Sequence, residues 1–384
     1  MRFEFATATR IVFGPGAVRE VVPAAQALGR RALVVTGRST ERAAGLVADL
    51  AAAGVSSALF SVAEEPSIAL VREGQQFARA EQCDVVIGFG GGSALDAAKA
   101  VAALLTNSGD VMDYLEVIGA GQALSVPSAA FIAIPTTAGT GTEVTRNAVL
   151  ASPEHRIKVS LRSPLMLARL AVIDPELTYD LPPAITARTG LDALTQLIEP
   201  YTSNRANPLT DGYCLEGMKR VARSLRRAYH DGHNAEARMD MSLASLLGGL
   251  SLANAGLGVV HGFAAPIGGM FPAPHGAVCA ALLPHGMEVN IRALRARAPG
   301  CETLHRYETV ARILTGKPNA TLEEGVEWAS ELVRGLQIPP LGTYGIEAGD
   351  IPTLAEKVSK ASSLKANPIV LTGDEQREVL SRAL

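Results

Sequence analysis

The pattern of apolar and polar positions changes character about midway along the 384-residue chain. In the first half, short apolar runs rich in β-branched residues alternate with longer stretches whose apolar residues recur at helical spacing. The runs RALVVTG, SSALFSV, CDVVIGFGGGS, AAFIAIPTT and LAVID predict strands, and residues 41–54, 67–82 and 93–107 predict helices. This alternation indicates right-handed βαβ units and a parallel sheet.

The segment DPELTYDLPPAITARTG ends the alternation. Pro182 and Pro183 stop the strand pattern, and helical periodicity continues from there to the end of the chain. We therefore expect an α/β domain over residues 1–182 and a helical domain over residues 183–384.

Charge and cysteine usage narrow the class of protein. The net charge is −3 and the pI about 6.2, so nucleic acid and anionic membrane are not expected as partners. The basic run KRVARSLRRA has helical spacing and predicts a solvated helix face. Four widely spaced cysteines predict reduced core thiols in a cytosolic protein.

Two segments bear on membrane targeting. The amino terminus lacks an uninterrupted apolar region, so no signal peptide is expected. Residues 242–260 carry no charge and are long enough to span a bilayer, but glycines and polar residues interrupt them. They predict a helix buried in a protein core.

A glycine-rich loop follows one predicted strand in VVIGFGGGSALDAAKA. Gly90, Gly91 and Gly92 allow close backbone approach, and the helix that Ser93 opens offers free N–H groups to an anion. A plain turn needs fewer glycines, so the loop favours a phosphate site, although it is not the spaced G-x-G-x-x-G fingerprint. A second cluster, IPTTAGTGTEVT, also follows a strand, and by itself it is equally consistent with a solvated turn.

Three histidines, His261, His275 and His285, lie in the uncharged stretch VVHGFAAPIGGMFPAPHGAVCAALLPHG. A buried imidazole needs a hydrogen-bond partner or a metal, since burying it without either costs about 1–3 kcal/mol. Spacing alone does not decide between these roles.

Together these segments resemble the iron-containing, group III alcohol dehydrogenases over nearly the whole chain, with FGPGAV, GLDALTQLIEPY and NPIVLTGDE as further matches. The resemblance implies a dehydroquinate-synthase-like architecture. In it, an amino-terminal Rossmann-like domain binds a dinucleotide, and a cleft toward an all-helical carboxyl-terminal domain holds a divalent metal facing the nicotinamide. It also implies a cytoplasmic homodimer acting on a small alcohol or carbonyl compound.

The family's cofactor motifs fall on a set of residues in the first half of this chain. They are Gly90, Gly91, Gly92, Ser93 and Asp96 at the pyrophosphate, then Thr136, Thr137, Thr140 and Asn147, and Lys158 at the nicotinamide ribose. Gly37 stands where NAD-specific members have an aspartate, and Arg38, Ser39 and Thr40 can bind a 2′-phosphate. The resemblance therefore implies NAD or NADP.

The family's metal ligands fall on Asp192, Gln196, His261 and His275, for iron or zinc, and Asp192, His261 and His275 are also the implied catalytic residues. Gln196 replaces a family histidine and is a weaker ligand, which leaves a metal-free polar substrate site open. Ala265 replaces the histidine thought to relay the alcohol proton. His285 is expected to be structural, and Phe263 and Phe271 are expected in the pocket wall.

The function so implied is an NAD(P)-dependent alcohol dehydrogenase that transfers hydride between a nicotinamide and a carbonyl carbon while a metal polarises the substrate oxygen. The alternative within the family is a metal-independent reductase like maleylacetate reductase, which the altered metal set favours. A dehydroquinate-synthase-like lyase and a non-catalytic binding protein fit the dehydrogenase motifs and the complete cofactor loop less well.

Overall fold

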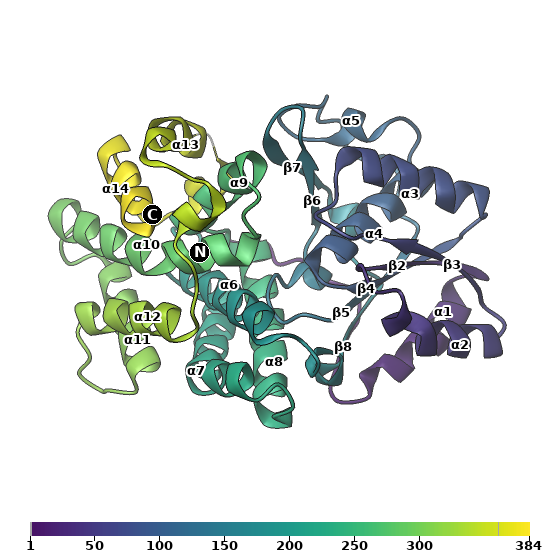
Figure 1. The fold of residues 1–384 in the computed structure, drawn as a ribbon, viewed down its shortest axis with the longest axis horizontal. Coiled ribbons are helices and arrows are strands. Elements are labelled where there is room, and N and C mark those ends of the chain that lie inside the picture. The colour runs from purple at the N-terminus through teal and green to yellow at the C-terminus, as the bar shows by residue number, and fades with distance from the viewer. Residues whose placement is uncertain (1, 360) are drawn as a thin grey trace. The chain divides into compact units, whose positions relative to one another are not determined.

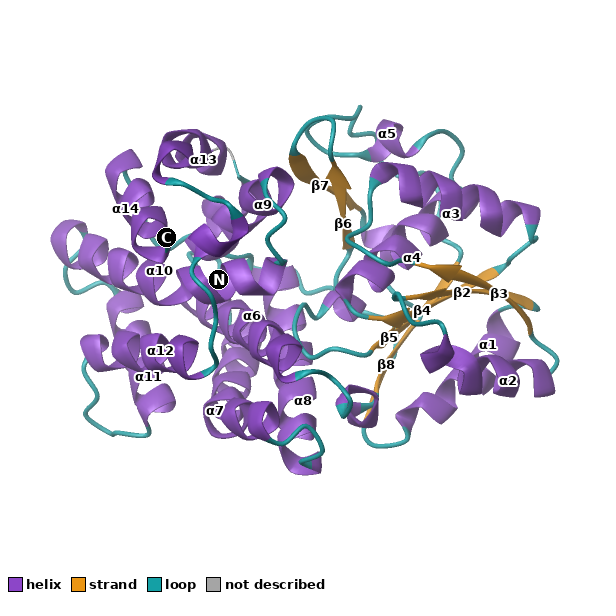
Figure 2. Ribbon diagram, viewed as in Figure 1, coloured by secondary structure: helices purple, strands orange, loops and turns teal. Residues whose placement is uncertain are grey.

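The computed structural model describes residues 2–359 and 361–384, and these form two compact units. The α/β unit comprises Ala6–Thr137 and Gly141–Thr178. The helical unit comprises Tyr179–Leu384 together with Ala138–Thr140 and the residues before Ala6. Within the described residues, every strand belongs to the α/β unit (Figure 2).

A six-stranded parallel sheet forms the middle of the α/β unit. Its strands are β1 (Ile11–Phe13), β2 (Arg31–Thr36), β3 (Ser56–Ser61), β4 (Val85–Gly90), β5 (Ala130–Pro135) and β8 (Leu170–Ile173). They lie in the order β1-β8-β5-β4-β2-β3. The chain builds outward from β2 to β3 on one side and from β4 to β5 and β8 on the other. Such a switch point opens a crevice at the carboxyl ends of β2 and β4, where open parallel sheets bind ligands.

Helices cover both faces of this sheet. They are α1 (Val21–Leu28), α2 (Ala44–Ala52), α3 (Ile68–Ala80), α4 (Gly92–Thr106) and the short α5 (Val111–Tyr114). Figure 1 shows α1 and α2 on the opposite side of the sheet from α3 and α4. Because strand side chains alternate, Val34, Ile87 and Ile132 all face the core shared with α1 and α2.

Glycine at position 88 lets α4 approach the other face closely. A Cβ there would lie 2.8 Å from Leu95 Cδ2 and 3.1 Å from Ala98 Cβ, both on α4. The loop that joins β4 to α4 is therefore held tightly over the end of the strand.

A hairpin stands apart from the main sheet. Its antiparallel strands are β6 (Asn147–Ser152) and β7 (Ile157–Arg162), in a register that pairs Ala151 with Lys158. Their alternating burial, with Ala148, Leu150, Val159 and Leu161 inside, gives the hairpin one apolar face.

The helical unit begins at the double proline. Its helices are α6 (Pro183–Thr202), α7 (Pro208–His230), α8 (Ala235–Ala255), α9 (Val259–Met270), α10 (His275–Arg297), α11 (Glu302–Thr315), α12 (Leu322–Gly335), α13 (Ile351–Ser359) and α14 (Gly373–Ala383). Asn207, Thr321 and Thr372 form capping boxes at the starts of α7, α12 and α14, so polar side chains satisfy the free N–H groups there.

The uncharged segment 242–260 is buried as predicted, but it belongs to two helices rather than one. In the described part of the chain, no single helix is long and apolar enough to cross a membrane. Helices α8 and α9 reach the length and apolar composition of a membrane span only when they are taken together, and the chain bends by 97° between them.

The predicted α/β class and the helical carboxyl-terminal half are confirmed, and each of the predicted strands and helices in the first half is present. The elements of the α/β unit that were not predicted include β1, α1, the short α5 and the two strands of the β6–β7 hairpin. β1 is too short to show a period, and the hairpin carries polar and charged residues that mask its alternation.

Candidate metal centre and nucleotide-binding loop

Helix α6 presents Asp192 and Gln196 on one face, one turn apart. Pro183 occupies its first turn, where a missing N–H is harmless. Both side chains are nearly inaccessible, with exposures of 1% for Asp192 and 2% for Gln196. The helix therefore carries two polar side chains into the interior of the unit, which requires partners for them.

His261, another of the predicted metal ligands, lies in the first turn of α9 and contacts Glu199 of α6. The Glu199 carboxylate accepts the Val260 N–H at 2.7 Å and lies 2.6 Å from His261 Nδ1. With Nδ1–H donating to this carboxylate, Nε2 is the ring nitrogen that faces Asp192 Oδ1, and it can bind a cation once it gives up its proton. A Cβ at Gly258 would lie 2.8 Å from Glu199 Oε1, so glycine there allows the contact.

Helix α10 supplies His275 as its first residue and Cys279 one turn later. The start of α10 approaches α6 so closely that a Cβ at Gly276 would lie 2.5 Å from the Arg188 carbonyl oxygen. The Cys279 side chain is fully buried, whereas the His275 side chain is 34% exposed. The open side of the cluster is therefore the side of His275.

Donor atoms from four of these residues converge. Asp192 Oδ1 lies 3.4 Å from His261 Nε2 and 3.6 Å from His275 Nε2, and Cys279 Sγ lies 3.7 Å from His275 Nε2. All four donor atoms are within 4.8 Å of one another. Asp192 Oδ1, His261 Nε2 and also Gln196 Oε1 are buried without any hydrogen-bond partner. Buried polar atoms are normally satisfied, so this donor set fits a cation.

The electrostatics of the cluster favour positive charge. Burial works against a charged His261 ring, but Cys279, Glu199 and Asp192 raise its pKa well above the ordinary value. Burial likewise opposes ionisation of Asp192, but His275 and His261 lower the pKa of its carboxyl. A divalent cation supplies the positive charge that these groups stabilise.

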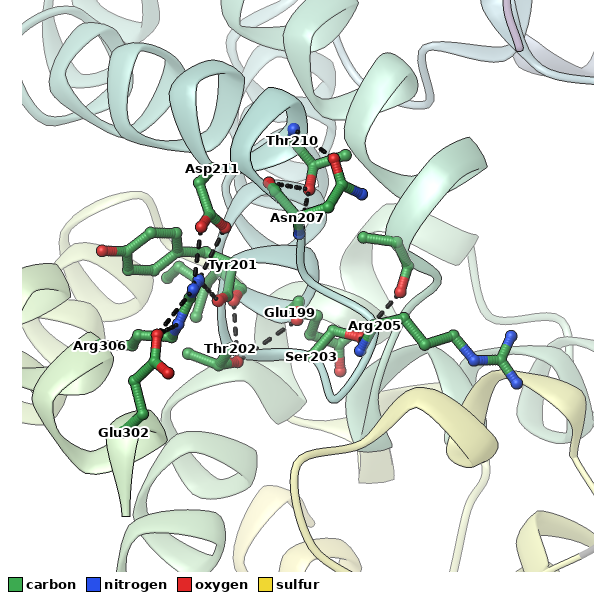
Figure 3. Close-up of polar contacts among 12 residues, drawn as sticks. Glu199, Tyr201, Thr202, Ser203, Arg205, Asn207, Thr210, Asp211, Glu302 and Arg306 are labelled. Carbon is green, nitrogen blue, oxygen red and sulfur yellow. Dashed lines mark hydrogen bonds and ion pairs between the residues drawn. The ribbon is translucent and has the colours of Figure 1, made fainter. Parts of the chain in front are cut away.

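Both ends of α6 are anchored, which fixes the position of the cluster. At the start, the buried Arg238 donates to Thr186 Oγ1 at 2.9 Å and to the Gly232 carbonyl at 2.7 Å. Figure 3 shows the other end, where Arg306 donates to the Tyr201 carbonyl at 2.9 Å and forms a bidentate pair with Asp211. A helix held at both ends keeps its carboxylates in register with α9 and α10.

In the α/β unit, the glycine-rich loop lies at the switch point of the sheet. A Cβ at Gly90 would lie 3.2 Å from the Gly37 backbone nitrogen, and one at Gly91 would lie 3.4 Å from Thr137 Oγ1. The Thr136 N–H donates to the Gly90 carbonyl at 2.8 Å. The structure thus brings together the ends of β2, β4 and β5 around the first turn of α4, which begins at Gly92 and includes Ser93.

Asp96 and Lys99 tie α4 to the segment that precedes the hairpin. The Asp96 carboxylate accepts from the Thr142 hydroxyl and from the Val149 N–H. The buried Lys99 ammonium donates to the carbonyls of Thr142 and Asn147, at 2.7 and 2.8 Å. These hydrogen bonds of Asp96 are therefore made to other parts of the same chain. Asn147 takes part in the network through its backbone carbonyl.

The remaining predicted cofactor residues differ in their surroundings. Lys158 on β7 has a 6% exposed side chain in an ion pair with Glu65. Ser39 is exposed, and its hydroxyl donates to Glu41 at 2.7 Å. Thr140 belongs to the short segment Ala138–Thr140 of the helical unit, in which Gly139 packs against Thr189.

Several sequence expectations need correction. Phe263 is fully buried in the apolar core of α9 and α10, so it does not line an open pocket, and Phe271 packs partly buried against the same core. The basic run is not simply a solvated face, since Arg220 and Arg223 both pair with the buried Asp240. The expectation for His285 needs no correction, since this residue lies outside the four-donor cluster.

Sequence reasoning missed Glu199 and Cys279 in this centre. Glu199 follows Asp192 by two helical turns in DALTQLIEPY, and that spacing is the signal that would have placed it on the same face. Cys279 follows His275 by one turn. Because the four cysteines show no paired spacing, the sequence by itself indicates only a core thiol at this position.

The geometry defines a class of protein: a parallel-sheet unit with a glycine-rich loop at its switch point and a helical unit with a buried donor cluster that fits a cation form the frame of a metal-using dehydrogenase. A family model described as iron-containing alcohol dehydrogenase matches residues 8–175, and the model for the C-terminal part of the same family matches residues 186–384. The chain belongs to the iron-containing alcohol dehydrogenase family.

Relatives agree with this assignment. The chain is 35% identical to choline dehydrogenase from Bacillus subtilis strain 168, covering 95% of this chain and 90% of the relative. It is also 35% identical to 1,3-propanediol dehydrogenase from Klebsiella pneumoniae, covering 95% and 94% of the two chains. A solved structure of 1,3-propanediol oxidoreductase superposes with a TM-score of 0.92 at 32% identity, covering 100% of each chain.

A second solved structure bears on the cofactor. Sulfoacetaldehyde reductase from Bifidobacterium kashiwanohense, in complex with NAD⁺, matches with a TM-score of 0.86 at 28% identity, covering 100% of this chain and 99% of that one. The chain is an oxidoreductase of the alcohol dehydrogenase type, and the comparisons do not favour the maleylacetate reductase alternative. Family, neighbour and donor cluster support NAD and a metal as its cofactors.

Proposed function

We propose that the protein interconverts a small alcohol and its aldehyde or ketone, using NAD(H) or NADP(H) and a divalent metal bound in the helical unit. The observation that carries this proposal is the set of three buried atoms without hydrogen-bond partners, Asp192 Oδ1, Gln196 Oε1 and His261 Nε2. A purely structural cluster would leave their desolvation uncompensated, at about 1–3 kcal/mol for each atom.

The roles of the residues follow from their positions. When bound, the metal polarises the substrate oxygen and the nicotinamide exchanges hydride with the carbonyl carbon. Asp192 supplies negative charge, and His261 presents Nε2 because Glu199 holds Nδ1. The partly exposed His275 ring marks the side from which a substrate oxygen reaches the centre.

The dinucleotide is assigned to the α/β unit. The pyrophosphate binds Gly90–Ser93 at the first turn of α4, with Thr136 and Thr137 beside it, and the adenosine ribose lies by Gly37 and Ser39. Asn147, Lys158 and Thr140 are assigned to the nicotinamide half, and Asp96 supports the loop. Lys158 must exchange its ion pair with Glu65 for a ribose hydroxyl when the cofactor binds.

The nucleotide, the metal and the oligomeric state are assigned from single features of the chain and from the family resemblance. Either nucleotide is proposed because Gly37 brings no carboxylate to the ribose, and iron and zinc are both candidates for the metal. A cytoplasmic homodimer is proposed from the family resemblance and from the four cysteines, which are free thiols as in reducing compartments. Sedimentation of the purified protein measures the oligomeric state directly.

The test is a panel of small aldehydes, including the aldehyde of 1,3-propanediol, assayed with NADH and NADPH before and after exhaustive chelation. We expect activity to disappear with the metal and to return when a divalent ion is added back. His261→Ala and His275→Ala should each lose activity by orders of magnitude, whereas His305→Ala, at an exposed surface position, should not. Full activity in demonstrably metal-free protein would overturn the metal's role.

A further inference from the structure

A buried thiol lies beside the predicted metal ligands. Cys279 is on α10, one turn after His275, and its Sγ is 3.7 Å from His275 Nε2. The thiol is fully buried and lies within 4.8 Å of donor atoms of Asp192, His261 and His275. An ordinary core cysteine packs among apolar side chains, whereas this one points its sulfur at a carboxylate and two imidazoles.

Several spacings in the cluster are close to those of a tetrahedral centre. With metal–nitrogen and metal–oxygen bonds of about 2.0–2.1 Å and metal–sulfur bonds of about 2.3 Å, tetrahedral ligand atoms lie roughly 3.3–3.6 Å apart. Three of the six separations here are 3.4, 3.6 and 3.7 Å, and all six are within 4.8 Å. The buried and unpartnered Asp192 Oδ1 and His261 Nε2 independently mark the same position as a ligand site.

Gln196 is a weaker candidate for the fourth ligand, although its Oε1 is also buried without a hydrogen-bond partner. Its stem packs against α8, where a Cβ at Gly248 would lie 3.3 Å from Gln196 Cβ. Its amide oxygen is a poorer ligand for zinc than a thiolate.

We propose that Cys279 is the fourth protein ligand of the metal and that the resulting Asp192/His261/His275/Cys279 set selects zinc over iron. The inference rests on the proposed metal-dependent function. On binding, the thiol loses its proton to solvent and the sulfur forms a bond to the cation, with no redox change. One carboxylate and one thiolate then balance a divalent charge, and mixed nitrogen and sulfur ligands in tetrahedral geometry are typical of zinc.

The test uses cobalt as a spectroscopic substitute for zinc in the full-length protein. After chelation, the wild type is loaded with Co²⁺ and its absorption spectrum recorded. We expect tetrahedral ligand-field bands and a near-ultraviolet sulfur-to-cobalt charge-transfer band. Cys279→Ala should abolish the charge-transfer band and weaken Zn²⁺ binding at least tenfold in competition with a chelating indicator. The matched control is Cys214→Ala, which removes a buried thiol on α7 and should change neither property.

Two further variants distinguish the loss of a metal ligand from the loss of the folded structure. Cys279→Ser nearly preserves shape, and its circular dichroism without metal should equal that of the wild type. Adding Gln196→His to Cys279→Ala should restore metal affinity without restoring the sulfur band, since imidazole then replaces thiolate. Under the proposal, the wild type should also bind Zn²⁺ more tightly than Fe²⁺ under anaerobic conditions.

Four results would overturn the proposal. If cobalt binds without a sulfur band, or if Cys279→Ala leaves Zn²⁺ affinity unchanged, Cys279 is not a ligand while the metal-dependent function stands. If the wild type prefers Fe²⁺, the selectivity is wrong. If the wild type binds no divalent ion at all, the proposed metal-dependent function fails together with this inference.

Discussion

Glu199 Oε2 lies 2.6 Å from His261 Nδ1, and this contact joins the end of α6 to the start of α9. The same carboxylate accepts the Val260 N–H, so it fixes both the ring and the backbone that carries it. A carboxylate in this position sets the tautomer of an imidazole and increases its strength as a ligand through the opposite nitrogen.

We therefore expect Glu199→Gln to fold but to bind a divalent metal about 10–100-fold more weakly, since loss of such an outer carboxylate has this effect in metal sites. Competition with a chelating indicator measures the affinity. Glu327→Gln, at an exposed ion pair with Arg334, is the control and should bind normally. Unchanged metal affinity in Glu199→Gln would mean that the carboxylate only supports the helix contact.

Cofactor preference should follow the charge beside the end of β2. A Cβ at Gly37 meets nothing within 4 Å, so Gly37→Asp fits and adds a carboxylate that repels a 2′-phosphate. We expect it to shift preference toward NADH by about tenfold, which requires only about 1.4 kcal/mol. Ratios of kcat/KM for the two nucleotides measure the shift.

The carboxylate of Glu41, which accepts a hydrogen bond from Ser39, should also disfavour a nucleotide with a 2′-phosphate. The hydrogen bond from Ser39 lowers the pKa of Glu41, so its carboxylate is charged at neutral pH. Glu41→Gln should therefore shift preference toward NADPH. A wild type that strongly prefers NADH, with neither substitution changing the ratio, would show that these residues do not contact the ribose.

The proton for the substrate oxygen has no side-chain donor at position 265. Ala265 is half-buried on α9, one turn after His261. We expect water to complete the transfer, so Ala265→His should raise kcat or move the pH optimum toward neutral, because a positioned acid contributes about 10²–10⁴-fold. If the pH profile of the wild type already shows a titration near neutral that disappears on replacing another residue, such as His285, that residue is the acid.

Glu143 should make the stability of the protein depend on pH. Burial raises the pKa of Glu143 from 4.5 to about 7, against the opposing effects of its backbone hydrogen bond and Lys99. The native state then holds a proton that the unfolded chain loses, so this contribution is complete below about pH 4.5 and is lost as the pH rises through 7. Relative to Glu143→Gln, the wild type should lose up to about 1.4 kcal/mol per pH unit in that window.

Urea unfolding at a series of pH values between about 5 and 8 gives this difference. A substitution at the exposed Glu154, Glu154→Gln, is the control and should run parallel to the wild type. Parallel curves for Glu143→Gln and the wild type would show that Glu143 is already ionised in the folded protein.

The parts of the fold that were predictable are those with strong local periodicity. Strands β2, β3, β4, β5 and β8 and helices α2, α3 and α4 each carry a clear apolar pattern, and the double proline marks the start of α6. The hairpin was missed because Lys158 and its neighbours interrupt the alternation, and their burial depends on partners such as Glu65 that are distant in the sequence.

The candidate site was predictable in part, and largely through family resemblance. The i, i+4 spacing placed Asp192 and Gln196 together, but no periodicity places α9 and α10 around α6. That arrangement depends on glycines at positions 258 and 276, whose role is visible only as the space that a Cβ would fill. The basic run was mispredicted for the same reason, since Asp240, the partner of Arg220 and Arg223, comes from another helix.

The donor cluster has a consequence for the lifetime of the protein. Its ligands come from three helices that are separate along the chain, so the unfolded polypeptide has no comparable site. A cation that binds only the native arrangement stabilises it by about 2.7 kcal/mol when free metal exceeds the dissociation constant a hundredfold. With the proposed metal binding, we expect metal supply to determine how much enzyme escapes proteolysis, so that scarcity depletes the protein itself as well as slowing each turnover.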